Sequence, residues 1–509
     1  MGSSGGSELL LPLSERLRLP IEQVNFAMCQ LFGLFTAFLF RNYLHPSKTN
    51  HIIRHVVATL LGLHFAFFCF GSYTVYFLGE VILLYCVMVT VHMKRIHKYS
   101  FLIAMAYLTM CQIIRVYWFD GKERSADFSG PLMVITQKVT KLAFELRDGL
   151  TRDESELSTS QKRLAVRRIP SLLEYLSYNL NFMGILAGPL NSYNDYISFI
   201  EGRNFEVGMN HPAIGKKSNK CPPNEPSSLG AVGCKILICT VCVFMHLYLL
   251  DVFPISYNTD RTFIATASIP VRLLYLYISS LACRPKYYFA WTIADAVNNA
   301  AGFGFTGYDS RGKPCWDLFS NLNIVKVEFA TSMKMFIDNW NIQTALWLKE
   351  VCYDRCPFNP TLSTFLLSAI WHGVYPGYYF TFITGTIMTL AARAVRNNLR
   401  PYFLGSSTYK MFYDVMTWAT TQVVVSYTVV PFVLPFLSSS FEFYRTWYFS
   451  LHIVAMVLIL MLPKKPRSTS REPPKFQVTK QSMILHHCNG QQNRRALVDS
   501  NQNHPTRID

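Results

Sequence analysis

Long stretches of this chain contain no Asp, Glu, Lys or Arg. The run from Thr361 to Ala392 has none in 32 residues. Further uncharged windows lie at Gln23–Phe40, Val56–Gly79, Ile236–Leu250, Val415–Phe441 and Thr446–Pro463. A helix of about 20 apolar residues spans the ~30 Å hydrocarbon core of a bilayer. These windows and the shorter apolar runs between them predict an all-α, polytopic membrane protein, with about nine to eleven membrane-embedded helices.

Charge is scarce along the chain and unevenly placed. Only 16% of the residues are charged, whereas globular proteins are near 25%. Residues 464–509 are basic and rich in Pro, Ser, Gln and Asn, which predicts a disordered tail on the cytoplasmic side. We therefore expect an amino-terminal segment at 1–20, a membrane domain at 21–463 and this tail. The net charge of +17 suits anionic headgroups, and without a basic soluble domain we expect no nucleic-acid partner.

One apolar segment carries a charged stripe. In residues 131–149, Lys138, Lys141, Glu145 and Asp148 repeat at helical spacing on one narrow face. The pattern indicates either a helix that lies in the membrane interface or one that packs inside the protein with a single wet stripe.

The most informative short stretch is SAIWHGVYPGYY, residues 368–379, inside the longest window described above. An ionisable residue within a membrane segment is costly, so His372 is a functional candidate. His64 and His246 also lie in apolar runs, and for such lone histidines a packing role is the better hypothesis. His372 differs because Gly373 and the following Pro and Gly loosen the helix beside its ring, and histidine suits proton abstraction near neutral pH.

A partner for this histidine is suggested by chain spacing. CPFNP, residues 356–360, is a turn signal. If the turn joins two antiparallel helices, Asn341 and His372 both stand ~23 Å from it along their helix axes. The sequence therefore predicts an amide facing an imidazole at one depth in the membrane.

The same residues carry a family resemblance. WHGVYPGYY resembles the W-H-G-x-x-x-G-Y motif of the membrane-bound O-acyltransferases. Three further elements are similar to those of the lysophospholipid branch, in the same order: Trp316-Asp317, Tyr427-x4-Phe432 and YRTWYFSLH at 444–452. WNIQT resembles the segment that bears the family's catalytic asparagine. MFIDNWN, residues 335–341, lacks the leading Phe-Tyr of the neutral-lipid branch, which favours a lysophospholipid acceptor.

The resemblance implies a fold and a reaction. It implies broken or re-entrant helices around an internal catalytic chamber, in the endoplasmic reticulum membrane. The reaction is acyl transfer from acyl-CoA, as co-substrate and without a metal or other cofactor, to the free hydroxyl of a lysophospholipid in phospholipid remodelling. His372 is then the general base, and Asn341 orients the reactants or holds the oxyanion. Supporting or substrate-binding roles fall to Trp371, Gly373, Tyr378, Trp340, Tyr444, Tyr448 and His452.

Several alternatives stay open at this point. A structural role for His452 is as well supported as a catalytic one. The acceptor headgroup (ethanolamine, choline or serine), an oleoyl or similar unsaturated donor, and the oligomeric state are not decided by the residues. A relative acting on a neutral lipid or a protein, or a lipid transporter or scramblase with His372 in a polar pathway, are the rival functions. GFGFTG at 302–307 fits a dinucleotide-binding pattern, but no strand precedes it, so we reject that interpretation.

Overall fold

The computed structural model describes residues 5–119, 127–205, 225–309 and 311–463. Within these ranges the only sheet is an antiparallel hairpin of two short strands, β1 (Gly307–Tyr308) and β2 (Pro314–Cys315). All other regular structure is helical, which confirms the all-α class. The segment GFGFTG leads into this hairpin rather than out of a parallel strand, and the basic tail at 464–509 lies outside the described residues.

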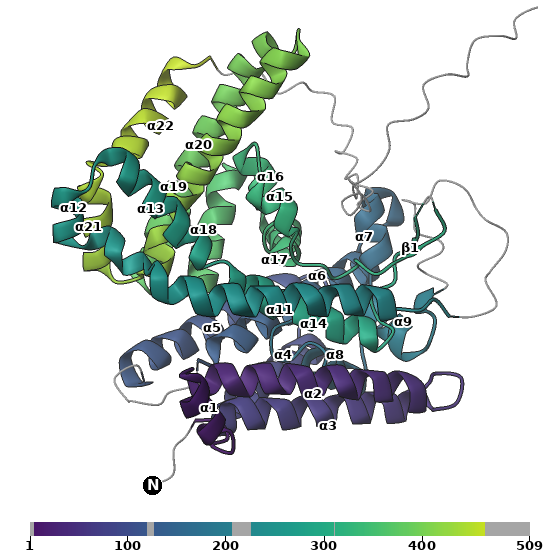
Figure 1. The fold of residues 1–509 in the computed structure, drawn as a ribbon. Helices are drawn as coiled ribbons and strands as arrows, with labels where there is room; N and C mark the ends of the chain where they lie inside the picture. Colours follow the sequence, from purple (N-terminus) through teal and green to yellow (C-terminus); the bar gives the residue numbers. More distant parts are fainter. Residues whose placement is uncertain (1–4, 120–126, 206–224, 310, 464–509) are drawn as a thin grey trace, which may run out of the picture.

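The first half of the chain forms a layer of long helices, with α2 and α3 side by side at its edge (Figure 1). Its elements are α1 (Leu11–Leu17), α2 (Ile21–Tyr43), α3 (His51–Phe70), η1 (Gly71–Tyr73), α4 (Thr74–Thr90), α5 (Ile96–Ile114), η2 (Arg115–Phe119), α6 (Ser129–Thr151), η3 (Glu154–Glu156), α7 (Thr159–Leu164), α8 (Leu172–Leu180) and α9 (Tyr193–Ile200).

The second half begins with a long helix that runs in nearly the same direction as α2 and α3, and it ends in a group of steeply inclined helices that includes α18, α19, α20 and α22 (Figure 1). Its helices are α11 (Leu229–Val252), η4 (Ile255–Thr259), α12 (Arg261–Thr266), α13 (Ile269–Ala282), α14 (Pro285–Ala300), α15 (Ile324–Glu328), α16 (Met333–Ile337), α17 (Ile342–Leu348), η5 (Lys349–Tyr353), α18 (Pro360–His372), α19 (Pro376–Leu399), η6 (Arg400–Phe403), α20 (Ser407–Val433), α21 (Leu437–Thr446) and α22 (Ser450–Met461).

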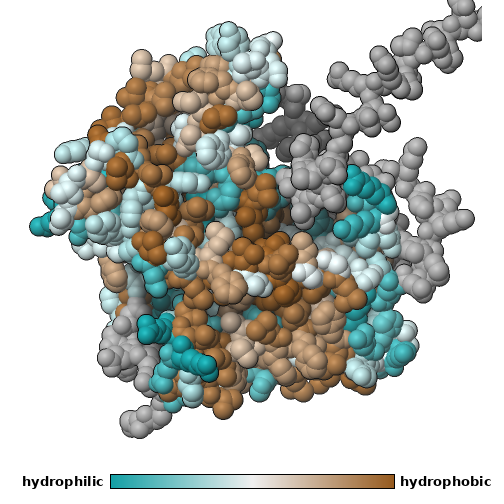
Figure 2. Space-filling view, viewed as in Figure 1, coloured by the Kyte–Doolittle hydropathy of each residue, from teal (hydrophilic) through white to brown (hydrophobic). Residues whose placement is uncertain are grey.

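Several of these helices suit a bilayer. By length and composition, four stretches of the described chain could cross a membrane, or five if α21 and α22, bent by 71°, count as one span. The four are Ile21–Tyr43, His51–Thr90, Ile96–Trp118 and Leu229–Thr259. Their outer faces are apolar, as in Phe32 and Phe35 on α2 and Phe244 on α11, and Figure 2 shows the resulting brown surface. The chain is therefore a multi-pass membrane protein.

Two windows that read as continuous in the sequence are broken in the structure. The window 361–392 is divided between α18 and α19, and the window 415–441 between α20 and α21. For this reason the helices able to span by length alone are fewer than the nine to eleven embedded segments counted from the sequence. The break after His372 is the one that the sequence predicts from Gly373 and Pro376.

The charged stripe of residues 131–149 lies on α6, and α6 is an interior helix. Lys138, Glu145 and Asp148 are at most 5% exposed, and Lys141 is 8% exposed. The interface alternative is therefore wrong. Lys141 and Asp148 pair with opposite charges, and Lys138 donates to the carbonyl of Tyr178. Lys141 forms ion pairs with Glu145 and with Glu350 of η5, which replace the water that an isolated charge needs.

Two hydrophobic cores fill the protein. The first lies among α2 to α6, α8 and α9, and it also takes in Trp347 of α17 and Trp371 of α18. The second lies among α13, α19, α20 and α21, and it includes Tyr427, Phe443 and Tyr444. His372 follows Trp371 directly, so it lies at the edge of the first core.

Candidate active site

The backbone turns sharply at His372. His372 is the last residue of α18, and Gly373 follows with φ +136°, a conformation that residues with a side chain rarely adopt. A Cβ at Gly373 would also lie 3.3 Å from the ring of Tyr378. Pro376, which has no N–H to leave unpaired, begins α19. The turn thus ends the helix at the histidine.

Gly377 is required for a close approach of two backbones. Its N–H donates a hydrogen bond of 2.9 Å to the carbonyl of Pro435, after the end of α20. A Cβ at Gly377 would lie 2.1 Å from the carbonyl oxygen of Pro431, far inside van der Waals contact. The start of α19 is therefore fixed against the kinked end of α20, where Pro431 interrupts the helix.

Four aromatic rings surround the imidazole of His372. The ring of Phe382 stacks on it at 5.1 Å between centroids, and Phe432 meets it edge-on at 4.9 Å. Trp371 lies at 4.7 Å and Tyr378 at 5.9 Å. Among the described residues no hydrogen bond to either ring nitrogen is formed, so packing alone orients the ring. A nitrogen of this kind is free to accept a proton from a substrate hydroxyl.

Trp371 anchors this turn to the first core. Its indole N–H donates to the carbonyl of Met133 on α6 at 3.1 Å, and its own carbonyl accepts from Nε2 of Gln112 on α5 at 2.9 Å. Its ring contacts Trp347 at 5.8 Å between centroids. The indole N–H of Trp347 in turn donates to Oγ1 of Thr140. The helix end that carries His372 is thus held from three helices.

Asn341 stands at the amino end of α17, immediately before its first residue, with φ +48°. Its side-chain oxygen accepts a 3.2 Å hydrogen bond from Nδ2 of Asn321, so its own amide N–H groups are left to donate elsewhere. A non-glycine residue in this conformation is strained, which is frequent at functional positions. Both Asn341 and His372 stand at the ends of their helices that are remote from the turn at 354–359.

Two helical segments do flank the turn, and the one before it begins just after Asn341. Helix α16 ends at Ile337 and α17 begins at Ile342. Between them the chain bonds to a neighbouring loop instead of to itself: Asn323 N–H donates to the carbonyl of Asn339, and Ile342 N–H to that of Asn321. These bonds satisfy the backbone that a continuous helix would have paired internally.

His452 belongs to a separate polar network. Its Nδ1 lies 2.9 Å from the hydroxyl of Tyr427, and its Nε2 lies 2.9 Å from Oγ1 of Thr384, which also accepts from Tyr444 at 3.0 Å. Both ring nitrogens are therefore engaged within the protein, an arrangement that ties α19, α20, α21 and α22 together. Tyr427 and Phe432 lie on the same helix, so α20 contacts both this network and the His372 ring.

Other candidates from the sequence lie elsewhere. Trp340 packs among Tyr287, Trp291 and Phe336. Tyr448 is 84% exposed, with φ +50°, at the bend between α21 and α22. The Trp316 indole donates to the carbonyl of Ser227, beside the hairpin. Within the described part of the chain, the structure gathers Trp371, Gly373 and Tyr378 around His372, whereas Trp340, Tyr444, Tyr448 and His452 form no hydrogen bond or ring contact with it.

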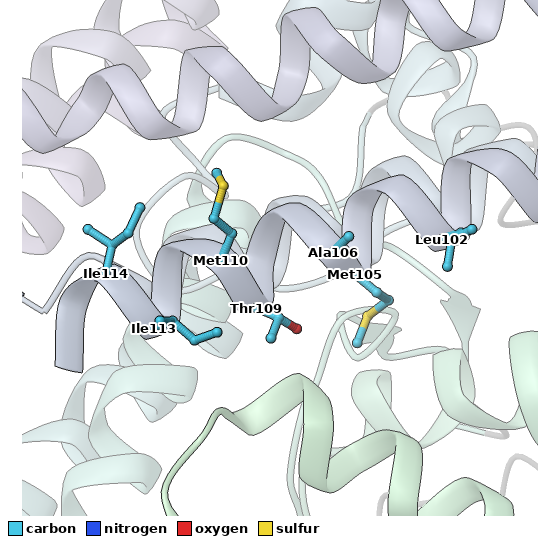
Figure 3. Close-up of a pocket in the computed structure, with 7 residues that line it drawn as sticks. All are labelled: Leu102, Met105, Ala106, Thr109, Met110, Ile113 and Ile114. Atoms are coloured by element: carbon cyan, nitrogen blue, oxygen red, sulfur yellow. The ribbon is translucent and has the colours of Figure 1, made fainter. Parts of the chain in front are cut away.

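Gln112 and Phe382 also touch this site, and no pattern in the sequence pointed to them. Gln112 lies on α5, whose outward face carries a shallow, open apolar patch lined only by residues of that helix. Figure 3 shows the side chains of this patch, from Leu102 to Ile114. Leu102, Met110 and Ile113 are exposed, as expected of a face that contacts lipid. Among the described residues no group of three or more His, Cys, Asp or Glu could hold a metal ion.

Comparison with known proteins adds to this geometry. The family model described as MBOAT, membrane-bound O-acyltransferase family, matches residues 35–430. Human membrane-bound glycerophospholipid O-acyltransferase 2 is 59% identical over 463 residues, which cover 91% of this chain and 89% of the relative. The human type 1 protein is 54% identical over 469 residues, with 92% and 94% covered. Lysophospholipid acyltransferase 6 of Drosophila melanogaster is 40% identical over 469 residues, with 92% of this chain and 64% of the relative covered.

Proposed function

The chain belongs to the membrane-bound O-acyltransferase family, and from that premise we propose that it acylates lysophospholipids with acyl-CoA. Residues 21–463 are the catalytic domain in this proposal. Relatives that match nearly the whole domain are glycerophospholipid O-acyltransferases, which supports a glycerophospholipid product. The observation that carries the assignment of residues is the position of His372, at the break between α18 and α19, among four aromatic rings and with no hydrogen-bond partner among the described residues.

In this mechanism His372 is the general base. The imidazole takes the proton from the free hydroxyl of the lysophospholipid as the hydroxyl oxygen attacks the thioester carbonyl. A new C–O ester bond forms, the C–S bond breaks, and the CoA sulfur leaves and takes up the proton from the imidazolium. No covalent acyl-enzyme is needed because the thioester is already activated.

Asn341 stabilises the oxyanion or orients the reactants. The hydrogen bond from Asn321 occupies the side-chain oxygen of Asn341, which supports a donor role for its amide nitrogen. Loss of one oxyanion donor typically lowers kcat by about 10²–10³-fold. The strained backbone at Asn341 supports a position selected for function rather than for stability.

Both substrates carry acyl chains, which accounts for a site inside the membrane. A low-water site keeps the thioester from hydrolysis and strengthens the electrostatic contacts of the transition state. The aromatic rings of Trp371, Phe382 and Phe432 supply such surroundings. Trp371, Gly373 and Tyr378 act in this proposal by holding the His372 ring, and Tyr444 and His452 by fixing the helices behind it.

The acceptor is lysophosphatidylethanolamine, lysophosphatidylcholine or lysophosphatidylserine, with an oleoyl or similar unsaturated donor. We also propose the endoplasmic reticulum membrane as the location, with the tail at 464–509 on the cytoplasmic side. The names of the relatives favour this acceptor class over neutral lipids and proteins, and over transport without chemistry.

The test is direct transfer by purified protein. The full chain in detergent is given oleoyl-CoA with each lysophospholipid in turn, then with diacylglycerol, and free CoA and the diacyl product are measured. Product that needs a lysophospholipid supports the proposal, and the ranking of acceptors identifies the headgroup. Asn341→Ala should lower kcat by about 10²–10³-fold. A wild-type enzyme that turns over only neutral lipid, or transports lysolipid without releasing CoA, refutes the proposal.

A further inference from the structure

A small basic pocket lies on elements that take no part in the site around His372. It opens where α2 ends and α3 begins, and it has room for about one water-sized atom. Three basic side chains line it: Arg41, His45 and Arg54. The remaining lining comes from the described residues Pro46, Phe199, Asn204, Phe205, Glu225, Ala301 and Gly302.

Arg54 is buried, and none of the described residues places a carboxylate against it. The side chain sits between two aromatic rings, with its guanidinium carbon 5.1 Å from the centroids of both Phe40 and Phe199, and the residue is 2% exposed. Its Nε and Nη1 have no hydrogen-bond partner among the residues that the structure describes. Within the described chain no carboxylate lies within 4.0 Å of it. A buried cation in this state is costly, and an oxyanion that reaches it removes the cost.

The one carboxylate that lines the pocket is already engaged. Glu225 lies 2.7 Å from Nε2 of His45 and 3.5 Å from Arg41. Arg41 also donates to Oγ of Ser228 at 2.8 Å and to the carbonyl of Pro226 at 3.0 Å. Two guanidinium groups therefore face a single carboxylate, and the deeper of the two, Arg54, is the unpaired one.

We infer that this pocket binds a phosphate group, with one phosphate oxygen entering toward Arg54 and Arg41 flanking the entrance. Arginine suits this ligand because its N–H groups match the geometry of phosphate oxygens. The pocket lies where two helices long enough to span a membrane are joined, which is the depth of lipid headgroups. The phosphate comes either from an anionic lipid headgroup or from free phosphate in solution.

Binding is measured on the full chain without an acyl donor, so the result does not depend on the acyltransferase proposal. Thermal unfolding of purified protein is followed in detergent with sodium phosphate, against sodium chloride at equal ionic strength. A second series uses nanodiscs of phosphatidylcholine with and without phosphatidic acid. We expect one of the two series to raise the unfolding temperature of the wild type.

Variants assign that effect to the pocket. Arg41→Gln and Arg54→Gln should weaken the apparent affinity at least about tenfold, because each removes a charge-assisted contact. Arg41 is nearer the entrance, so its variant serves if Arg54→Gln fails to fold. Glu225→Gln should bind more tightly, since it removes the competing negative charge. Arg167→Gln removes the same charge from an exposed ion pair outside the pocket and should bind as the wild type does.

Each outcome of these measurements leads to a different conclusion about the pocket. Stabilisation by sodium phosphate that is lost in Arg41→Gln but kept in Arg167→Gln supports the pocket as a site for free phosphate. Stabilisation by phosphatidic acid alone, with the same dependence on the variants, supports a headgroup site. No stabilisation beyond the chloride control in either series, or stabilisation that Arg41→Gln and Arg54→Gln both retain, overturns the inference.

Discussion

Substitution of Gly377 by alanine tests the packing that holds the turn after His372. The added Cβ meets the carbonyl oxygen of Pro431 at 2.1 Å and Cα of Pro435 at 2.6 Å, where ordinary contacts begin at 3.4 Å. Both obstacles are backbone atoms, which cannot rotate away as a flexible side chain can. The start of α19 and the end of α20 must therefore separate by about 1 Å.

The expected loss of stability follows from the contacts that this separation disrupts. The hydrogen bond from Gly377 N–H to the Pro435 carbonyl is worth about 1 kcal/mol net, and overpacking a filled interior typically costs about 1–3 kcal/mol. We expect the free energy of unfolding to fall by about 3 kcal/mol. Tyr378 and Phe382, which contact the His372 ring, move with α19, and a 1 Å displacement of a catalytic group can lower the rate about 100-fold.

Gly233→Ala is the matched control. Gly233 is also a helical glycine, in α11, but its added Cβ has no atom within 4 Å. Alanine is the better helix former by about 1 kcal/mol, so this variant should unfold at the wild-type temperature or slightly above it. The assays are thermal unfolding followed by tryptophan fluorescence and CoA release dependent on lysolipid. A Gly377→Ala protein with wild-type unfolding temperature and rate refutes the close approach of α19 and α20.

Three further substitutions test other parts of the account. Tyr427→Phe removes the hydroxyl that lies against Nδ1 of His452, and it should lower the free energy of unfolding by about 1–2 kcal/mol. Thermal unfolding measures this loss, and an unchanged unfolding transition argues against a structural role for the network around His452. Lys141→Met leaves Glu145 and Glu350 without their cation, and it should lower the free energy of unfolding by about 3 kcal/mol in the same assay. An unchanged free energy of unfolding means that water reaches these carboxylates on α6. The Tyr448 side chain is 84% exposed. Tyr448→Ala should therefore change the rate of CoA release less than twofold and the free energy of unfolding by less than about 0.5 kcal/mol. A large loss of rate would instead indicate that Tyr448 contacts the substrate.

Local signals in the sequence predicted the break at His372 correctly. Gly373 and Pro376 act on the backbone of their immediate neighbours, so their effect does not depend on the rest of the fold. The charged stripe on α6 could not be interpreted in the same way. Lys141 and Asp148 pair with Glu350 and Arg355, which lie 209 and 207 residues away in the chain. Only the tertiary fold brings these charges together. In the sequence, a charged face exposed to solvent and a set of buried ion pairs show the same pattern.

The candidate site also combines features that the local sequence predicts with contacts that depend on the tertiary fold. Residues adjacent to His372 in the chain, Trp371, Gly373 and Tyr378, could be named because they surround it through local geometry. Phe382 faces the ring because α19 packs back against α18, and Gln112 reaches it from α5. For His452 the sequence left a catalytic and a structural role open. The structure engages both of its ring nitrogens, which favours the structural role.

The measurement that tests the central claim most directly compares wild type, His372→Ala and His64→Ala in detergent. His64 lies in an apolar helix on an exposed face, so its variant controls for the loss of any membrane histidine. Each protein is first checked for folding by its unfolding transition, and then free CoA is measured with oleoyl-CoA and the preferred lysophospholipid. The account predicts release that requires the lysolipid, persists in His64→Ala and falls to background in His372→Ala. A folded His372→Ala protein that releases CoA at the wild-type rate contradicts the assignment of His372 as the general base.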